Sequence, residues 1–132
     1  MLTNTEMKMN TKDLNWTKWK ILPNPSKSYD SFRTLMIKAV RNPSYPGVYQ
    51  LKNSDTGEYV LFGVGVKVGE RMCSLIPKEH GGVGRRNNHY KREYVWKNIE
   101  HIQFRTITTE TRNEALEIER FLKHQNIHIF NT

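Results

Sequence analysis

One glutamate, Glu119, lies at the edge of a surface that the sequence predicts to be buried. When residues 112–124 are wound as a helix at about 100° per residue, Ala115, Ile118 and Leu122 fall within an arc of about 60°. Glu119 lies beside this arc, about 40° from Ala115. A carboxylate at the edge of a buried surface is costly unless it is paired or binds a cation. Glu119 is therefore either one partner of a structural salt bridge or a catalytic or metal-ligating carboxylate.

A second chemically distinctive stretch, residues 77–92, joins glycines to cationic, amide and aromatic side chains. Lysine and arginine neutralise backbone phosphates, and asparagine and arginine can also hydrogen-bond to purine edges. We therefore predict a DNA-contacting insertion here, and the alternative is a solvated basic loop. The residues predicted to contact DNA are Arg85, Arg86, Asn87, Asn88, His89, Lys91 and Arg92.

The composition of the whole chain also favours a polyanionic partner. Its 132 residues include 21 Lys and Arg against 13 Asp and Glu, which gives a formal net charge of +8 at pH 7. Cys73 is the single cysteine, which excludes an internal disulfide and a thiolate metal cluster. No stretch approaches the roughly 18 apolar residues of a membrane span. We expect a cytoplasmic protein with no membrane partner.

The elements that must position these residues fall into two parts. A change in composition predicts a boundary between an N-terminal helical extension, residues 1–45, and a main domain, residues 46–132. Within the extension, two helical segments are predicted over residues 13–19 and 31–40, because a Pro- and Asn-rich break separates them. Apolar side chains recur at helical spacing in the second segment.

The pattern changes to strands at the start of the main domain. Residues 47–52 and 58–65 are rich in β-branched, aromatic and aliphatic side chains and flank an Asn, Asp and Gly cluster, which predicts a β-hairpin. A short helix is predicted over residues 68–76, where Pro77 ends it. Residues 99–107 are predicted to form a third strand.

The helix that carries Glu119 has the clearest start signal in the chain. Thr111 and Glu114 have the spacing of a capping box, in which each side chain accepts a hydrogen bond from the other residue's backbone N–H. Residues 127–132 follow as an extended tail that is expected to return to the core.

Several of these residues, taken in order, resemble the GIY-YIG nuclease domain over residues 45–132. The resemblance implies an α+β fold with a small three-stranded antiparallel sheet flanked by helices. It rests on Gly47-Val48-Tyr49 on the first strand, Leu61-Phe62-Gly63 on the second, Arg71 eight residues after Gly63, the helix with Glu119, and Asn131.

The resemblance also implies an activity, the metal-dependent hydrolysis of one DNA strand at a time. Tyr49 would be the general base or would orient the attacking water. Arg71 would hold the scissile phosphate and offset its charge in the transition state. Glu119 would ligate a single Mg²⁺ or Mn²⁺ ion. Because one site cuts one strand, a double-strand break would require a homodimer, a second encounter or a partner subunit.

The sequence departs from the family's pattern at one position. The second tyrosine of the motif falls at Leu61, which has no proton to give or take. Tyr59 lies two residues earlier and is expected on the same strand face, and Lys67 lies between this strand and Arg71, so either could supply the missing polar group. His80, like His89, could relay a proton near neutral pH.

Two other functions account for part of the same pattern. A catalytically inactive DNA-binding module with the GIY-YIG fold would explain Leu61 and the positive charge. A basic RNA-binding protein would explain the charge but gives no reason for Glu119 to face the core.

Overall fold

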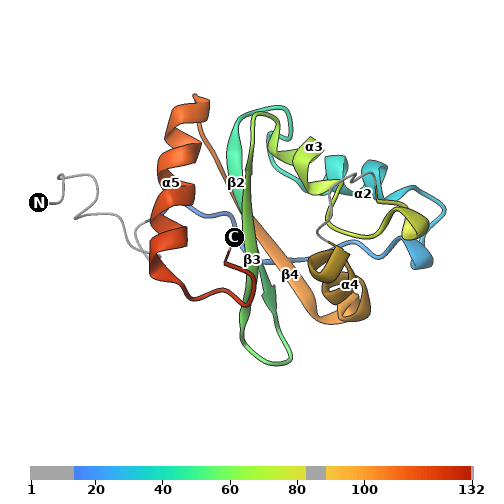
Figure 1. Ribbon diagram of the computed structural model, residues 1–132. Helices are drawn as coiled ribbons and strands as arrows, with labels where there is room; N and C mark the ends of the chain where they lie inside the picture. The colour runs from blue at the N-terminus through green and yellow to red at the C-terminus, as the bar shows by residue number, and fades with distance from the viewer. Residues whose placement is uncertain (1–13, 83–88, 132) are drawn as a thin grey trace, which may run out of the picture.

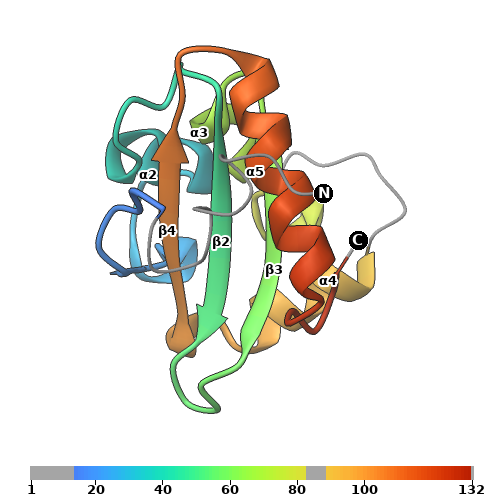
Figure 2. The same cartoon turned by 90° about the vertical axis from the view of Figure 1, so that its left-hand side faces the viewer.

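The structure, a computed structural model, describes residues 14–82 and 89–131 and has an α+β fold built on a four-stranded antiparallel sheet. The strand order is β1-β4-β2-β3, so β3 is an edge strand. Figure 1 shows helix α5 on one face of the sheet and α2, α3 and α4 on the other, and Figure 2 shows β4, β2 and β3 side by side. The strands are β1 (Lys20–Ile21), β2 (Gly47–Asn53), β3 (Tyr59–Gly65) and β4 (Ile102–Thr108).

The helices bury the two faces of the sheet in separate apolar clusters. The helices are α2 (Phe32–Ala39), α3 (Val68–Met72), α4 (His89–Lys97) and α5 (Arg112–Gln125), with short 3₁₀ turns η1 (Pro25–Lys27), η2 (Lys78–His80) and η3 (Ile99–His101). On the side of α2, α3 and α4, the cluster includes Leu51, Val60, Met72, Ile76, Val95 and Phe104. On the side of α5, it consists of Val48, Phe62, Ile107, Ala115, Ile118 and Leu122.

The hairpin and the last helix form where the local sequence predicts them. In the turn between β2 and β3, the Asn53 side chain accepts a hydrogen bond from the backbone N–H of Asp55 at 2.9 Å, and Gly57 adopts φ +78°. Such Asx geometry and a positive φ are what Asn and Gly provide. The capping box of Thr111 and Glu114 is present in both directions at the start of α5.

The predicted helix over residues 13–19 is wrong where the structure describes it, because residues 14–19 are not helical. Instead, the backbone of this segment hydrogen-bonds to β4: the N–H of Thr17 donates to the carbonyl of Thr106 at 2.9 Å. β1 then pairs with β4 and adds a fourth strand to the three that were expected. The second predicted helix is confirmed as α2, and its side chains Phe32 and Met36 are fully buried.

Two other element boundaries differ from the sequence prediction, and one helix was not predicted at all. Helix α3 ends at Met72, so it covers only the first part of the helix that was expected over residues 68–76. The third strand begins at Ile102, because η3 occupies the residues just before it. Helix α4 forms within the basic segment, where no element was predicted. Within the described residues, none of the helices has the length and apolar character to cross a membrane.

A β-bulge in β3 separates Tyr59 from Leu61. Leu61 pairs with Leu51, but Lys52 pairs with Tyr59, so Val60 is an extra residue on β3. Because one inserted residue reverses the alternation of side chains, Tyr59 and Leu61 lie on opposite faces of the sheet. Tyr59 stacks on Trp19, with 6.2 Å between the ring centroids. The prediction that Tyr59 shares the face of Leu61 is therefore wrong.

The C-terminal tail returns to the core, as predicted, beside the start of β3. The N–H of Phe130 donates to the carbonyl of Val60 at 2.9 Å, and His128 is buried. The side-chain Oε1 of Gln50 accepts a hydrogen bond from Arg105 Nε at 2.8 Å, and Gln50 Nε2 lies 2.9 Å from His128 Nε2. Burial lowers the pKa of His128 to about 4, so the ring is neutral and can accept this hydrogen bond.

Candidate active site

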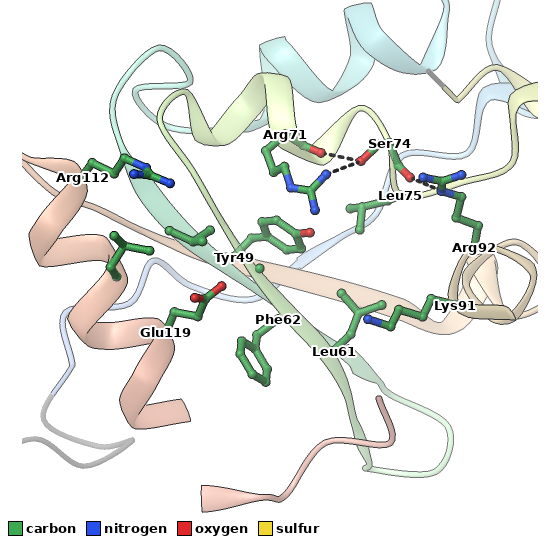
Figure 3. Close-up of a pocket in the computed structure, with 13 residues that line it drawn as sticks. Tyr49, Leu61, Phe62, Arg71, Ser74, Leu75, Lys91, Arg92, Arg112 and Glu119 are labelled. Atoms are coloured by element: carbon green, nitrogen blue, oxygen red, sulfur yellow. Dashed lines mark hydrogen bonds between the residues drawn. The ribbon is translucent and has the colours of Figure 1, made fainter. Parts of the chain in front are cut away.

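A pocket of about 600 Å³ lies along residues 61–64 of the edge strand β3 (Figure 3). It begins where the hydrogen bonds between β3 and the C-terminal tail end, and it receives side chains from β2, α3, α4 and α5. Its apolar floor includes Leu61, Phe62, Val64, Leu75 and Leu116, and its polar lining consists of Tyr49, Arg71, Ser74, Lys91, Arg92, Arg112 and Glu119.

Two glycines on β3 make room for the side chains that enter the pocket. Gly63 pairs with Tyr49, and a Cβ at position 63 would overlap the Tyr49 hydroxyl. A Cβ at position 65 would lie 2.7 Å from the Cβ of Arg71. The Tyr49 side chain is consequently buried, with 4% of its surface exposed, and its ring lies directly against the backbone of β3.

Helix α3, which carries Arg71, is short but tied to its surroundings on both sides. Glu70 forms an ion pair with Arg33 of α2, and the Arg33 guanidinium lowers the pKa of that carboxyl group. Gly69 packs against Pro43 so closely that a Cβ at position 69 would overlap the proline ring. These contacts fix the part of the chain from which the Arg71 side chain extends.

Ser74 connects two of the guanidinium groups in the pocket. Arg71 Nη1 donates to the Ser74 hydroxyl at 3.4 Å, and Ser74 in turn donates to the Arg71 carbonyl at 2.9 Å. Arg92 Nε donates to the Ser74 carbonyl at 3.1 Å. Because Ser74 contacts both side chains, the guanidinium groups of α3 and α4 are oriented relative to each other (Figure 3).

The pocket concentrates positive charge. Four cationic side chains and one carboxylate line it among the described residues. Burial, and next the charge of Arg71, lower the pKa of Lys91 from its ordinary value, which places these two cations within electrostatic reach of each other. An anion between them would relieve this repulsion. The pocket is therefore suited to a phosphate group.

Within residues 14–82 and 89–131, Glu119 has none of the partners that a structural salt bridge would require. Its side chain is half-buried and points from α5 towards Tyr49 (Figure 3). Among the described residues, it makes no hydrogen bond and no ion pair within 4.0 Å. The structure therefore favours a catalytic or metal-ligating role for Glu119 over a structural salt bridge.

The donor set in the pocket fits a hydrated divalent cation held together with substrate oxygens. The part of the chain that the structure describes contains no cluster of three His, Cys, Asp or Glu side chains that could hold a metal on their own. Mg²⁺ commonly keeps several waters and binds through one or two carboxylates plus substrate phosphates. A single carboxylate in a pocket lined by cationic side chains, as at Glu119, is compatible with this mode of binding.

The structure brings five of the predicted site residues into one pocket. Tyr49, Arg71 and Glu119 arrive from three different elements, and Lys91 and Arg92, which were predicted as DNA contacts, join them from α4. The predicted DNA contacts at residues 85–88 lie outside the described residues.

Four other predicted residues are not among those that line the pocket. Tyr59 faces the side of the sheet opposite Leu61 and packs on Trp19 and His128, and Lys67 is exposed just before α3. His80 stacks on Trp96 with 4.2 Å between ring centroids, and His89 packs on its neighbour Tyr90 at 4.3 Å. Asn131, part of the resemblance, donates through Nδ2 to the carbonyl of Lys123 near the end of α5.

Arg112 and Ser74 are pocket residues that the sequence analysis missed. Arg112 precedes Glu119 by seven residues, which is about two helical turns, so it lies on the same face of α5. The helical winding that singled out Glu119 could therefore have identified Arg112. No sequence signal distinguishes Ser74, whose role depends on the turn after α3.

Searches against protein-family models, curated proteins and solved structures find no match to this chain. The functional inference consequently depends on the residues and geometry of the pocket.

Proposed function

We propose that the protein is a metal-dependent endonuclease that hydrolyses DNA phosphodiester bonds, one strand at a time, in the pocket along β3. The observation that carries the proposal is Glu119: a half-buried carboxylate without an ion pair among the described residues, in the same pocket as Tyr49 and Arg71. The GIY-YIG fold is part of this proposal, with β2, β3 and β4 as its three-stranded sheet and β1 as an addition.

Each residue has a role that its surroundings support. Arg71 binds the scissile phosphate, because a guanidinium fork matches phosphate oxygens and its orientation is supported by Ser74. Tyr49 accepts a proton from the attacking water or orients it, since its ring is fixed against β3. Glu119 holds Mg²⁺ or Mn²⁺, which when bound offsets negative charge on the reacting phosphate and the leaving oxygen. Arg92 and Arg112 extend the positive surface along the DNA backbone.

The test is cleavage of supercoiled plasmid by the purified protein with Mg²⁺ or Mn²⁺. Conversion to nicked circles is expected, and a chelator should abolish it. Glu119→Gln should reduce the nicking rate by at least about 100-fold while gel retardation of DNA persists. Glu117→Gln is the matched control, because Glu117 is exposed on the same helix, and it should cleave like the wild type. Equal nicking by Glu119→Gln and the wild type would contradict the proposal.

A DNA-binding module without cleavage is the second candidate, and the observation that favours it is Leu61. This apolar side chain, 4% exposed, lines the pocket where a second polar group would be expected. Such a module would retard DNA in a salt-dependent manner and leave the plasmid intact with either metal. Stronger retention of RNA than of DNA under the same conditions would instead indicate an RNA-binding protein.

A further inference from the structure

A lysine from another element lies next to Leu61 in the pocket. Lys91 extends from α4 so that its side chain lies beside Leu61 (Figure 3). Leu61 and Gly63 are two residues apart on β3, beyond the bulge, so they share the face on which the Tyr49 hydroxyl rests. Lys91 and Tyr49 therefore enter the same pocket over neighbouring positions of one strand.

The chemistry proposed for Tyr49 requires cations near its hydroxyl. A phenol ordinarily loses its proton near pH 10, and burial disfavours the charged phenolate further. Of the residues that the structure describes, the charged groups that enter this pocket are Arg71 from α3, Lys91 and Arg92 from α4, and Arg112 and Glu119 from α5. Figure 3 shows the Tyr49 hydroxyl directed towards the side of the pocket where Arg71 and Lys91 lie, with Glu119 on the other side of the ring.

We propose that Lys91 is a positioning residue that acts through Tyr49: its ammonium group, together with Arg71, stabilises the Tyr49 phenolate and allows Tyr49 to be the general base. Lys91 thus supplies from α4 the polar group that Leu61 cannot supply from β3. This inference rests on the proposed nuclease function and specifies how its base is generated.

The proton balance of the step is as follows. Tyr49 first loses its proton to solvent. The phenolate then takes a proton from the attacking water as the water oxygen bonds to phosphorus, and the bond between phosphorus and the leaving oxygen breaks. The leaving oxygen takes up a proton from solvent, so one water is consumed for each phosphodiester bond.

The experiment compares the pH dependence of single-turnover cleavage among three variants and the wild type. Lys91→Met keeps the length of the side chain without its charge, and Lys91→Arg keeps the charge. Lys97→Met is the matched control, because Lys97 is exposed at the end of the same helix. In Lys91→Met, we expect the acid limb of the profile to move up by about one pH unit and the rate at pH 7 to fall about tenfold. Lys91→Arg should restore most of the rate, and Lys97→Met should match the wild type.

Two kinetic results would overturn the inference. One is an unchanged acid limb in Lys91→Met, even with weaker DNA binding, because Lys91 would then be only a phosphate contact. The other is an equal rate loss in Lys91→Arg and Lys91→Met, which would indicate a packing role.

A spectroscopic titration separates this inference from the proposed function. The tyrosinate absorbance that is present in the wild type and absent in Tyr49→Phe reports on Tyr49 alone. This signal should develop at a lower pH in the wild type than in Lys91→Met, whether or not plasmid is cut. Identical titrations would refute the role of Lys91, whereas a shifted titration with an intact plasmid would refute only the nuclease.

Discussion

The phenol ring of Tyr49 occupies the space that a side chain at position 63 of the neighbouring strand would need. Gly63 is paired with Tyr49 in the register of β2 and β3, and a Cβ added there would overlap the hydroxyl and the ring. The glycine is thus a requirement of the pocket, and its replacement can be used to test how firmly the ring is held.

Gly63→Ala should displace Tyr49 and reduce the cleavage rate by at least about 100-fold, because a misplaced base no longer reaches the attacking water. Overpacking should also cost about 1–3 kcal/mol of unfolding free energy. Urea unfolding of Gly63→Ala, Tyr49→Ala and the double variant measures the coupling. The double variant should lose less stability than the sum of the single losses, and additive losses would show that the two side chains do not compete for space.

Arg71→Lys should lower the cleavage rate by about 100-fold and change DNA retention little, because an ammonium group cannot replace a guanidinium fork on a phosphate. The measurement is single-turnover cleavage beside gel retardation. Arg41→Lys, at an exposed position outside the pocket lining, is the control and should cleave normally. A normal rate in Arg71→Lys would mean that Arg71 contributes only positive charge.

Tyr59→Phe should leave the cleavage rate within about twofold of the wild type, since the bulge at Val60 turns Tyr59 to the face opposite Leu61 and Tyr59 is not among the residues that line the pocket. Tyr49→Phe, assayed in parallel, should lose cleavage because the hydroxyl is absent. A strong loss in Tyr59→Phe would show that the polar group missing at position 61 comes from Tyr59 after all.

The unfolding free energy should fall as the pH is lowered from 6.5 to about 4, because burial holds the pKa of His128 at about 4 in the folded protein, against 6.5 for an unperturbed histidine. In this window the unfolded chain takes up a proton and the folded protein does not. The loss contributed by His128 should total about 3 kcal/mol and level off below pH 4, with the full contribution retained above pH 6.5.

Urea unfolding at several pH values checks this expectation. His128→Gln should lack this part of the pH dependence, whereas His124→Gln, at an exposed position on α5, should retain it. Equal slopes in His128→Gln and the wild type would contradict the assignment.

Local signals predicted those parts of the fold that local interactions form. The capping box of Thr111 and Glu114 and the apolar stripe of α5 lie within one helix, and the Asn and Gly residues of the hairpin act within one turn. The same helical winding predicted that Glu119 would face inward. These predictions were correct because the residues that determine each element are only a few positions apart in the sequence.

The features that were predicted wrongly or missed depend on residues far away in the sequence. β1 consists of two residues, Lys20 and Ile21, that are extended because β4 provides a pairing edge, which no local sequence pattern reveals. The bulge at Val60 is a property of the register between two strands. Helix α4 buries only Val95 of its residues, so its apolar periodicity is weak and its contribution of Lys91 and Arg92 to the pocket could not be predicted.

The extra residue in β3 divides one strand into two segments with different surroundings. Before Val60, Tyr59 contacts Trp19 and His128, and beyond it, Leu61 and Gly63 border the pocket. The two segments still communicate at one point, because Phe62, which lines the pocket, also packs on His128 of the tail with 4.6 Å between ring centroids. A substitution that repacks the tail at His128 should therefore reach the pocket through Phe62. Deletion of Val60 would restore simple alternation along β3 and turn the side chains on one side of the deletion to the other face of the sheet. Strand length here should therefore tolerate less variation than side-chain identity.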